Sequence, residues 1–440
     1  MTAEQLKASI LQMAIEGRLV PQLDDEPAVN IAGEVPEEVP FAIPEKWKWM
    51  RLETVCKSIV DGDHMPPPKV GEGIPFLVIS NISSGYINFQ NTHFVPESYY
   101  EALQPSRKPE KDDILLAVTG SLGVSVMVNT KQRFTFQRHI ALLKPKYEYI
   151  LPKYILILLR TRSLCNKIKE ISTGIAQKTV SIKALRKVTI PLSPLAEQRR
   201  IVARFEELLP LVEEYGNAHA ALKKAEEALP DQLRASLLQE AIQGKLVPQL
   251  DDEPAVDIAG EEPDEVPFAI PEKWKWIFLG DAVVYGKAEQ AAGSNIPKDA
   301  WILDLEDIEK ERGVVLQKKR GIATTSNKSR FYKGNVLYSK LRPYLNKVVV
   351  AEEDGYCTTE IIPIDPRSNG YEIDADYLKT YLMSPYFVHY ANERSYGVKM
   401  PRLGTKDAKA AAFPLPPLAE QRRIVARLEE LLPHVDAMAG

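Results

Sequence analysis

The string PLAEQRRIVAR occurs twice in this chain, at residues 194–204 and again at residues 417–427. A second string, PQLDDEPAV, also occurs twice, at residues 21–29 and 248–256. Self-similarity at a fixed spacing indicates a duplicated architecture, and it decides the fold before any single element is assigned. The sequence therefore predicts two halves of similar fold, each bounded by repeated borders.

The two repeats have different offsets, 223 residues for the first string (194 to 417) and 227 residues for the second (21 to 248). The block between the borders is thus shorter in the second half. When the alignment is extended to both ends of the chain, only residues 218–227 have no counterpart. The segment 194–247 is continuous, whereas its second copy is divided between the C-terminus and the N-terminus. This organisation predicts a pseudo-twofold circular arrangement that is open within one connector.

The borders have the pattern of helices that pair. From Ile201 onward, apolar residues recur at alternating spacings of four and three, which is the a/d seam of a coiled coil. The divided copy has the same seam at residues 6–15 and 424–435. We therefore expect the central helix to pair in antiparallel fashion with the two terminal helices. We also expect kinks or breaks at Pro210 and Pro230.

The blocks between the borders have the pattern of small α/β domains. Residues 46–193 contain short β-branched runs bounded by Gly, Asn and Asp, such as GIPFLVISNI and RHIALLKP, and then a helical pattern at 152–170. Residues 273–416 repeat this style, with a helical pattern at 375–392. The predicted fold class is α/β (α+β), with two variable domains joined by an antiparallel coiled-coil spacer.

The expected organisation has five parts. These are an N-terminal helix at 1–20, a first domain at 21–193, a central helical spacer at 194–247, a second domain at 248–416 and a C-terminal helix at 417–440.

Composition and charge limit the cellular setting. The formal net charge is −4, so a basic protein that coats nucleic acid would look different, although local basic patches are compatible with this sum. The three cysteines are isolated, which fits a reducing cytoplasm. The N-terminus lacks the basic start and apolar core of a signal peptide, and no window is apolar enough to span a bilayer. We expect a cytoplasmic protein.

Motifs for catalysis are absent from the sequence. It contains no G-x-x-x-x-G-K-[ST] string, no G-x-G-x-x-G after a strand, no Asn/Asp-Pro-Pro-Tyr/Phe string and no Glu-x-Lys. The histidines are scattered without metal-ligand spacing. The string DGDH at 61–64 is explained better by a glycine turn with Asx contacts than by a metal site. We expect neither a catalytic residue nor a metal site in this chain.

Recognition chemistry is concentrated in one run of the second block, NKSRFYKGNVLYSKLRPYLNK at 327–347, which contains no acid. Lys and Arg neutralise phosphates, while Arg and Asn read guanine and adenine edges. A solvated surface is the alternative interpretation of such a run. The candidate DNA-binding residues here are Asn327, Lys328, Arg330, Lys340, Arg342, Tyr344 and Asn346.

The first block has a weaker set of candidates. They are Lys69, Asn81, Lys131, Arg133 and Arg138. Late in each block a Gly and then a Lys precede the run into the spacer helix, and Lys178 and Lys399 are expected to occupy similar places. These two lysines and Arg402 complete the candidate set, although a simple turn explains the segments equally well.

These features together resemble the specificity (S) subunits of type I restriction–modification systems, over nearly the whole chain. The resemblance rests on the PLPPLAEQRRIV-type strings, the helix end LLQEAIQGKLVPQ and IPEKWKW at the start of each block. Within the blocks, GIPFLVISNI, STGIAQKTVSIKALRKVTIPL, KLRPYLNKVVVAEEDGYCTTE and VKMPRLGTKD are also typical of the family. Each string alone is modest support, but their order, twice over, is specific.

The resemblance implies that each block is a target recognition domain that reads one part of an asymmetric split DNA sequence. It implies that the repeated helices form the spacer between the two domains. The implied partners are double-stranded DNA, two modification (methyltransferase) subunits and restriction subunits. The S subunit itself is not catalytic, and S-adenosylmethionine, ATP and Mg are implied for the partner subunits only.

Two alternatives stay open at the level of sequence. One is a helical scaffold whose duplicated domains bind proteins, and the other is a fusion-type restriction enzyme that has lost its catalytic part, or a fragment of one. A DNA reader is expected to bind DNA with a steep negative dependence on salt, whereas a scaffold is expected not to bind it.

Overall fold

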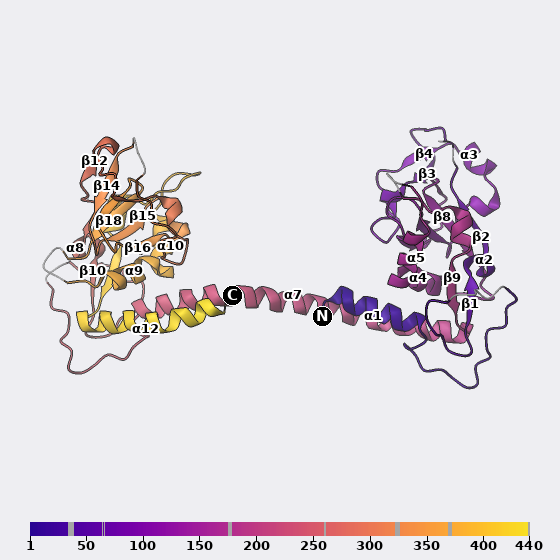
Figure 1. Cartoon of the computed structure of the whole chain (residues 1–440), viewed down its shortest axis with the longest axis horizontal. Coiled ribbons are helices and arrows are strands. Elements are labelled where there is room, and N and C mark those ends of the chain that lie inside the picture. The colour runs from indigo at the N-terminus through magenta and orange to yellow at the C-terminus, as the bar shows by residue number, and fades with distance from the viewer. Residues whose placement is uncertain are drawn as a thin grey trace. The chain divides into compact units, whose positions relative to one another are not determined.

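The structure is a computed structural model, and it divides the chain into two compact units, Met1–Leu222 and Lys223–Gly440. The helix α7 (Leu195–Ile242) supplies residues to both units (Figure 1). The boundary between the units therefore falls inside the segment 194–247 that was expected to be the spacer. The structure describes residues 1–33, 39–63, 65, 67–174, 178–258, 261–321, 326–367 and 372–438.

The first unit is built around a four-stranded antiparallel sheet of order β2-β8-β5-β6. A second sheet has the order β4-β3-β7, and β1 pairs with β9 where the domain meets the spacer. The elements are α1 (Ala3–Ile15), β1 (Lys48–Arg51), α2 (Leu52–Val55), β2 (Cys56–Asp61), β3 (Ile74–Leu77), η1 (Ile79–Asn81), β4 (His93–Val95), α3 (Glu97–Ala102), η2 (Pro105–Arg107), β5 (Ile114–Ala117), β6 (Ser125–Met127), β7 (Thr135–Phe136), β8 (Ile140–Pro145), α4 (Pro152–Arg160), α5 (Arg162–Glu170), α6 (Ile182–Arg186) and β9 (Thr189–Leu192).

Both faces of the four-stranded sheet are buried. Successive residues of a strand point to opposite faces. In β5, Ile114 and Leu116 join a core with α1, α4, α5 and the start of α7. Leu115 and Ala117 join a second core with residues of β3 and β7. Strands covered on both faces have continuous apolar sequences, and this is why ILLA and IALL do not alternate with polar residues.

The second unit repeats this plan. Its central sheet has the order β11-β18-β15-β16, and β10 pairs with β19 beside the spacer. The elements are β10 (Lys275–Phe278), α8 (Leu279–Ala282), β11 (Val284–Tyr285), β12 (Gln290–Ala291), η3 (Gly293–Asn295), β13 (Trp301–Leu303), η4 (Leu305–Asp307), β14 (Lys328–Phe331), β15 (Val336–Ser339), η5 (Pro343–Leu345), β16 (Val348–Val350), β17 (Gly355–Thr358), β18 (Ile361–Asp365), α9 (Ala375–Met383), α10 (Pro385–Glu393), α11 (Thr405–Lys409), β19 (Ala412–Leu415) and α12 (Leu418–Ala437).

Besides its central sheet, each unit has an outer sheet that contains neither the central strands nor the strand pair beside the spacer. The two units differ in this outer sheet. Each unit has one parallel pair there, β3 with β7 in the first unit and β13 with β17 in the second. The first unit extends this pair with β4, whereas the second extends it with β14 and β12. The repeat is therefore closest around the central sheet and diverges in this outer sheet.

The terminal helices pair with α7 in antiparallel fashion, as predicted. In the first unit, the Tyr215 hydroxyl donates to the Met1 carbonyl at 2.6 Å, so the start of α1 lies beside the middle of α7 (Figure 1). In the second unit, Arg234 of α7 pairs with Asp436 near the end of α12. Between these paired stretches the seam is exposed, since the exposed fraction is 58% for Leu222 and 40% for Leu229.

The predicted breaks at Pro210 and Pro230 are wrong, because α7 is one helix of 48 residues. A proline inside a helix removes one backbone hydrogen bond and strains the preceding turn. Here α1 packs on the first part of the helix and α12 on the last part, and the neighbouring sequence is rich in strong helix formers such as Glu, Ala and Leu. These terms outweigh the local cost of each proline.

The helical patterns at 152–170 and 375–392 each form two helices instead of one. The backbone is extended at Thr161 and at Ser384, and each side chain caps the helix that follows. Thr161 accepts from the Leu164 amide at 3.3 Å, and Ser384 accepts from the Phe387 amide at 3.3 Å. A hydroxyl that satisfies free amide groups at a helix start favours a new helix at that point.

The repeated strings meet in space in the first unit. Trp47, from IPEKWKW, donates its indole hydrogen to Glu197, from PLAEQRR, at 2.7 Å. Gln22, from PQLDDEP, donates to the same carboxylate. Arg200 pairs with Glu26, which joins PLAEQRR to PQLDDEP a second time. The strings thus recur because together they fix the domain to the spacer helix.

The second unit repeats part of this contact. Arg423 pairs with Glu253 and also donates to the Pro248 carbonyl at 3.0 Å. Gln421 accepts from the Asp374 amide at 2.9 Å, as Gln198 accepts from the amide before α4 in the first unit. The predicted fold class, α/β domains joined by an antiparallel helical spacer, is confirmed.

Candidate nucleic-acid interface

One backbone framework is repeated in the two units at the end of the central sheet. In the first unit, Val118 donates to the His139 carbonyl at 3.0 Å and Gly120 donates to the Lys178 carbonyl at 3.2 Å. Val180 donates back to the Val118 carbonyl at 2.8 Å. The loop after β5, the turn before β8 and the segment before α6 are thereby held together. We call this set the first bridged loops.

The second unit has the same three hydrogen bonds. Lys340 donates to the Glu360 carbonyl at 3.0 Å, Arg342 to the Pro401 carbonyl at 2.7 Å, and Leu403 to the Lys340 carbonyl at 3.0 Å. We call this set the second bridged loops. The pattern pairs each residue with a partner in the other unit, and the side chains at paired positions differ. The pairs are Gly120 with Arg342, Lys178 with Pro401, His139 with Glu360 and Thr179 with Arg402.

This pairing corrects the expected match between Lys178 and Lys399. Lys178 corresponds to Pro401 through its backbone bond, and Lys399 lies two residues earlier in its segment. Both lysine side chains are exposed. The position that matches Lys399 in the first unit is 176, which lies outside the described residues, as does His64 of the DGDH string.

The left-handed backbone at the start of the loop is shared as well. Gly120 has φ of 71° and Arg342 has φ of 51°. Asn346, at the end of the same loop, has φ of 46°. A side chain rarely adopts this region because Cβ crowds the backbone, and such residues gather at functional sites. The second unit thus has an arginine at the position where the first unit has a glycine, which is the residue that tolerates a left-handed backbone.

The candidate run 327–347 is only partly a surface. Lys328 lies in β14 with 6% of its surface exposed, and its ammonium group pairs with Asp304 at 2.5 Å. The prediction that Lys328 reaches DNA is therefore corrected, because its charge is used inside the domain. Arg330 lies over the Tyr332 ring at 4.9 Å and pairs with Glu289 at 3.5 Å.

The remaining members of that run have different positions. Asn327 and Tyr344 are exposed, and Lys340 and Arg342 are half-buried in the second bridged loops. The amide nitrogen of Asn346 donates to the Met383 carbonyl at 2.9 Å, which anchors the loop on α9. The structure therefore brings Lys340 and Arg342 together, while Asn346 supports the loop that holds them.

Arg402 joins the second bridged loops through its side chain. Its guanidinium makes a two-pronged contact with the Glu360 carboxylate, with nitrogen–oxygen distances of 3.0 to 3.2 Å. A bidentate pair of this kind fixes the geometry of both partners. Arg402 thus positions the loop, and the same backbone position in the first unit carries the small residue Thr179.

The prediction that Asn81 contacts DNA is corrected for the same reason as the prediction for Lys328. Its side chain is buried, with 4% exposed. Its amide oxygen accepts from the Val78 amide at 2.9 Å, and its nitrogen donates to the Asn88 carbonyl at 2.9 Å. Asp307 makes the matching contact in the second unit, where it accepts from the Asp304 amide at 2.9 Å. Asn81 therefore shapes a loop.

The candidates Lys131, Arg133 and Arg138 lie on either side of β7. Lys131 is exposed. Arg133 pairs with Glu97 at 2.5 Å and Glu101 at 3.1 Å, so its charge is largely compensated by α3. Arg138 is exposed and stands beside the first bridged loops.

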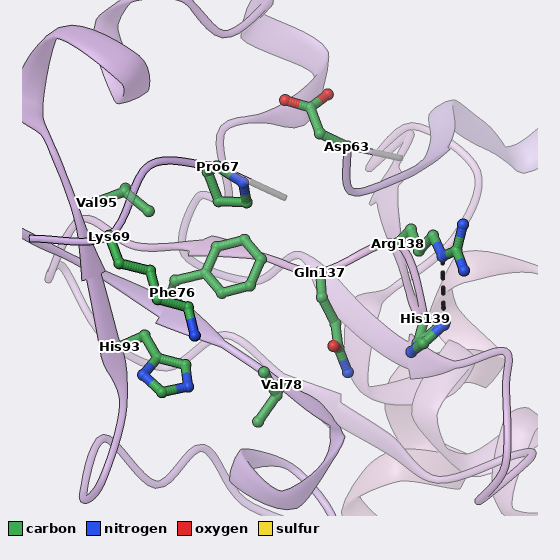
Figure 2. Close-up of a pocket in the computed structure, with 10 residues that line it drawn as sticks. All are labelled: Asp63, Pro67, Lys69, Phe76, Val78, His93, Val95, Gln137, Arg138 and His139. Atoms are coloured by element: carbon green, nitrogen blue, oxygen red, sulfur yellow. Dashed lines mark hydrogen bonds between the residues drawn. The ribbon is translucent and has the colours of Figure 1, made fainter. Parts of the chain in front are cut away.

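A cavity of about 380 Å³ opens next to Arg138. Figure 2 shows Lys69 and His93 on one wall, and Gln137, Arg138 and His139 on the other. The apolar part of the lining consists of Pro67, Phe76, Val78 and Val95, and Asp63 completes it. The structure therefore brings two candidates, Lys69 and Arg138, to one site.

The electrostatics of this cavity favour an anion. Asp63, the acid among the described lining residues, already accepts from the Tyr99 hydroxyl at 2.5 Å and pairs with Arg107. Arg138 approaches the His139 ring at 3.4 Å (Figure 2). Burial, followed by the charge of Arg138, lowers the pKa of His139 below its usual range. Lys69 and Arg138 supply positive charge to the cavity.

Sequence reasoning missed three residues of this cavity, namely His93, Gln137 and His139. The string TKQRFTFQRH contains two of them next to Arg138. Nothing in this string indicates the turn between β7 and β8 that exposes them. His93 comes from β4, which is distant in sequence. Among the described residues, no group of three or more His, Cys, Asp or Glu side chains is arranged to hold a metal ion.

The chain matches the family model for the type I restriction modification DNA specificity domain at two places, residues 44–214 and 273–438. These two ranges make up well over half of the chain. The chain therefore belongs to this family. The duplicated borders and the duplicated framework of hydrogen bonds are the structural counterpart of the two matches.

Curated relatives match along most of their length. The type I restriction enzyme EcoAI specificity subunit of Escherichia coli is 25% identical, over 98% of this chain and 89% of the relative. The EcoDI specificity subunit of the same species is 27% identical, over 74% of this chain and 71% of the relative. The prediction of a type I specificity subunit is confirmed.

Among solved structures, the HsdS subunit from Thermoanaerobacter tengcongensis is similar with a TM-score of 0.51. It is 22% identical, and the match covers 91% of this chain and 93% of that chain. This likeness bears on the fold alone. Within the described part of the chain, none of the helices is long and apolar enough to cross a membrane.

Proposed function

We propose that this chain is the DNA-reading subunit of a type I restriction–modification complex, and that its two domains read different halves of a split target. The observation that carries the proposal is the set of backbone hydrogen bonds that is repeated in the two units with different side chains. The same hydrogen bonds present Gly120 and His139 in one unit, and Arg342 and Glu360 in the other. An identical scaffold with different side chains is what two readers of unlike sequences require.

The division of roles follows from the described geometry. Exposed or half-buried polar groups at the bridged loops are suited to base edges, whereas the exposed lysines Lys131, Lys178 and Lys399 are suited to phosphates. Lys69 and Asn327 are further phosphate or base contacts at exposed positions. Phosphate contacts position a protein on the duplex, and base contacts determine the sequence that it selects.

The proposal assigns the chemistry to other chains. This chain carries no catalytic motif in its sequence, so methyl transfer with S-adenosylmethionine belongs to two modification subunits. Translocation and cleavage with ATP and Mg belong to restriction subunits. The spacer formed by α1, α7 and α12 would then serve as the support on which these partners and the two domains are arranged.

Domain exchange tests this function. Residues 46–193 are replaced by the corresponding block of a relative, and the methylated sites of a host carrying the complete system are mapped. We expect one half of the target to change and the other half to stay as it was. If both halves change, or neither, the two-reader assignment is wrong.

A binding titration tests the alternative of a protein-binding scaffold. The full chain, assembled with its modification subunits, is titrated with duplex DNA at increasing salt. A DNA reader loses affinity steeply, since each phosphate contact contributes about 0.9 to the slope of log affinity against log salt. The absence of DNA binding would favour the scaffold.

A further inference from the structure

The cavity of the first domain has the chemistry of a nucleotide site. One part of its lining is apolar and includes an aromatic ring, Phe76, with Val78 and Val95 beside it. Lys69 and Arg138 supply positive charge. Its volume of about 380 Å³ lies in the range of ligand-binding pockets. A ligand that matches it has a flat apolar body, hydrogen-bonding edges and a negative charge.

The polar groups of the cavity are available to such a ligand. Within the described part of the chain, the side chains of Lys69, His93 and Gln137 make no hydrogen bond or ion pair to another residue. Gln137 is half-buried, and Figure 2 shows its amide beyond the ring of Phe76 and near Val78. A polar group of the lining that has no protein partner can be satisfied by a ligand that supplies donors and acceptors, which makes such a group suitable for recognition.

The charge of the lining selects an anion. The carboxylate of Asp63 is occupied by Arg107 and the Tyr99 hydroxyl, so it contributes little repulsion. Lys69 stands on one wall and Arg138 on the other (Figure 2). Both positive side chains can therefore attract the phosphates of a strand that approaches the cavity.

We propose that this cavity holds one nucleotide of the target DNA, unstacked from the duplex, with its base against Phe76 and its phosphate between Lys69 and Arg138. Gln137 then reads the edge of the base, since an amide matches the donor and acceptor of a nucleobase. Proteins that hold an extruded base use this combination of apolar walls and edge hydrogen bonds. The proposal rests on the DNA-reading function proposed above and adds a specificity determinant to the first domain.

The second domain does not repeat this chemistry. The position of His139 is taken by Glu360, whose carboxylate is held by Arg402. Paired in this way with Arg402, the carboxylate offers no positive charge to a phosphate. We therefore expect one extruded nucleotide in the half-site of the first domain and none of this kind in the other half-site.

An abasic scan tests the proposal with the full chain assembled with its modification subunits. Duplexes carrying the mapped target receive an abasic site opposite each nucleotide of the first half-site in turn, and affinity is measured by fluorescence anisotropy at fixed salt. Removing the pairing partner of an extruded base lowers the cost of extrusion. An abasic site opposite the base that the modification subunit methylates should also tighten binding, because a methyltransferase extrudes that base itself. Besides that position, we expect one duplex to bind about tenfold more tightly than the intact target, while abasic sites opposite the remaining positions weaken binding or leave it unchanged.

The gain at that position must depend on the cavity. Arg138→Ala and Gln137→Ala should abolish it, and Lys111→Ala, an exposed lysine of the same domain outside the lining, should preserve it. These three side chains are exposed or half-buried, and thermal unfolding of each variant verifies its fold. If no position besides that of the methylated base shows the gain, or if the gain persists in the cavity variants, the proposal is overturned. If the intact target itself is not bound in a sequence-specific way, the DNA-reading function fails instead.

Discussion

Arg342 has a conformation that a glycine would adopt more easily. Its φ of 51° matches the 71° of Gly120, the residue with the same backbone hydrogen bond in the first unit. Its Nε is buried and has no hydrogen-bond partner among the residues that the structure describes. A left-handed non-glycine residue costs about 1 kcal/mol or more. The backbone conformation alone would therefore favour glycine over arginine at this position. This is the behaviour expected of a residue that serves recognition.

Replacing Arg342 separates stability from recognition. Arg342→Gly should leave the free energy of unfolding within about 1 kcal/mol of wild type, since relief of the left-handed strain offsets the greater chain entropy of glycine. Binding of the target should weaken about tenfold, the cost of one lost base contact. Denaturant unfolding and DNA anisotropy measure the two quantities. A large loss of stability with unchanged DNA binding would make Arg342 a structural residue.

Glu197 should make stability depend on pH. Burial raises the pKa of this carboxyl above its usual range, and hydrogen bonds from Trp47 and Gln22 only partly oppose the shift. The folded state therefore binds a proton more readily than the unfolded state does. The resulting destabilisation begins as pH rises through about 4.5, the unfolded value, and becomes constant above the folded pKa.

Glu197→Gln removes this titration and keeps an oxygen that can accept from Trp47. The variant should unfold at a higher temperature than wild type near neutral pH, and the difference should shrink towards zero below pH 4.5. Paired thermal melts across this window measure the difference. A variant that is less stable than wild type at neutral pH would show that the ionised carboxylate is stabilising.

Single residues show where sequence reasoning succeeds and where it fails. Arg138 and Lys69 were predicted from residue type, and the structure places both at one cavity. Lys328 and Asn81 were predicted on the same grounds, but one is in a buried ion pair and the other holds a loop. Residue type gives the available chemistry, whereas burial and partners depend on contacts between segments distant in sequence.

At the scale of elements, the turns that end α1 and α7 are built from the same residues. Gly17 has φ of 71° and Gly244 has φ of 68°. A Cβ at Gly17 would lie 2.8 Å from Cδ of Pro44, and one at Gly244 would lie 2.6 Å from Cδ of Pro271. Each helix end is thus closed by a proline from the string that leads into the domain. A glycine just after a helical pattern is a recognisable stop signal in the sequence, but the contact of Gly244 with Pro271 is not.

Alanine at either glycine should destabilise the unit that contains it. The left-handed backbone and the overlap with proline together cost about 2 kcal/mol or more. Gly85→Ala is the matched control, because Gly85 has φ of 86° and open space around its Cβ position. Its cost should be limited to about 1 kcal/mol from the backbone alone. Equal effects in chemical denaturation would mean that the proline contacts contribute nothing.

Strands show the limit of prediction at this scale. The runs that form β3 and β8, GIPFLVISNI and RHIALLKP, were predicted because apolar, β-branched sequence is visible locally. The short strands β7 and β12 were not, since two residues carry no periodicity and are ordered by a neighbouring strand. The same dependence on neighbours explains α7, in which packing by α1 and α12 outweighs two prolines.

For the whole molecule, the segment 218–227 is the part of the spacer without a counterpart, and it lies inside α7. Inserting four residues there adds about 6 Å of helix and slightly more than one turn. We predict a longer gap between the two half-sites, with both half-sites unchanged. Methylome mapping of the insertion variant measures the gap. An unchanged gap would mean that this segment does not set the distance.

The two-unit organisation was predictable because the repeat is written in the sequence itself. The pairing of Gly120 with Arg342 and of His139 with Glu360 was not, because these residues share no sequence similarity and are related only by backbone hydrogen bonds. Predicting them required the register of β5 with β8 and of β15 with β18. The framework is thus a property of the fold, while the side chains on it vary between the units.

The contacts of Glu197 and Arg200 with Trp47 and Glu26 have a consequence for inheritance. These four residues belong to the duplicated strings, and they attach the first domain to its helix together with groups of the variable interior, such as the Leu151 amide that donates to Gln198. A gene segment that begins in one string and ends in another can therefore be transferred as a unit, and its product arrives with its own attachment points. Near-identical borders also give recombination two places to align within one gene. New pairs of half-sites can then arise by exchange of segments, without a single substitution in the recognition surfaces.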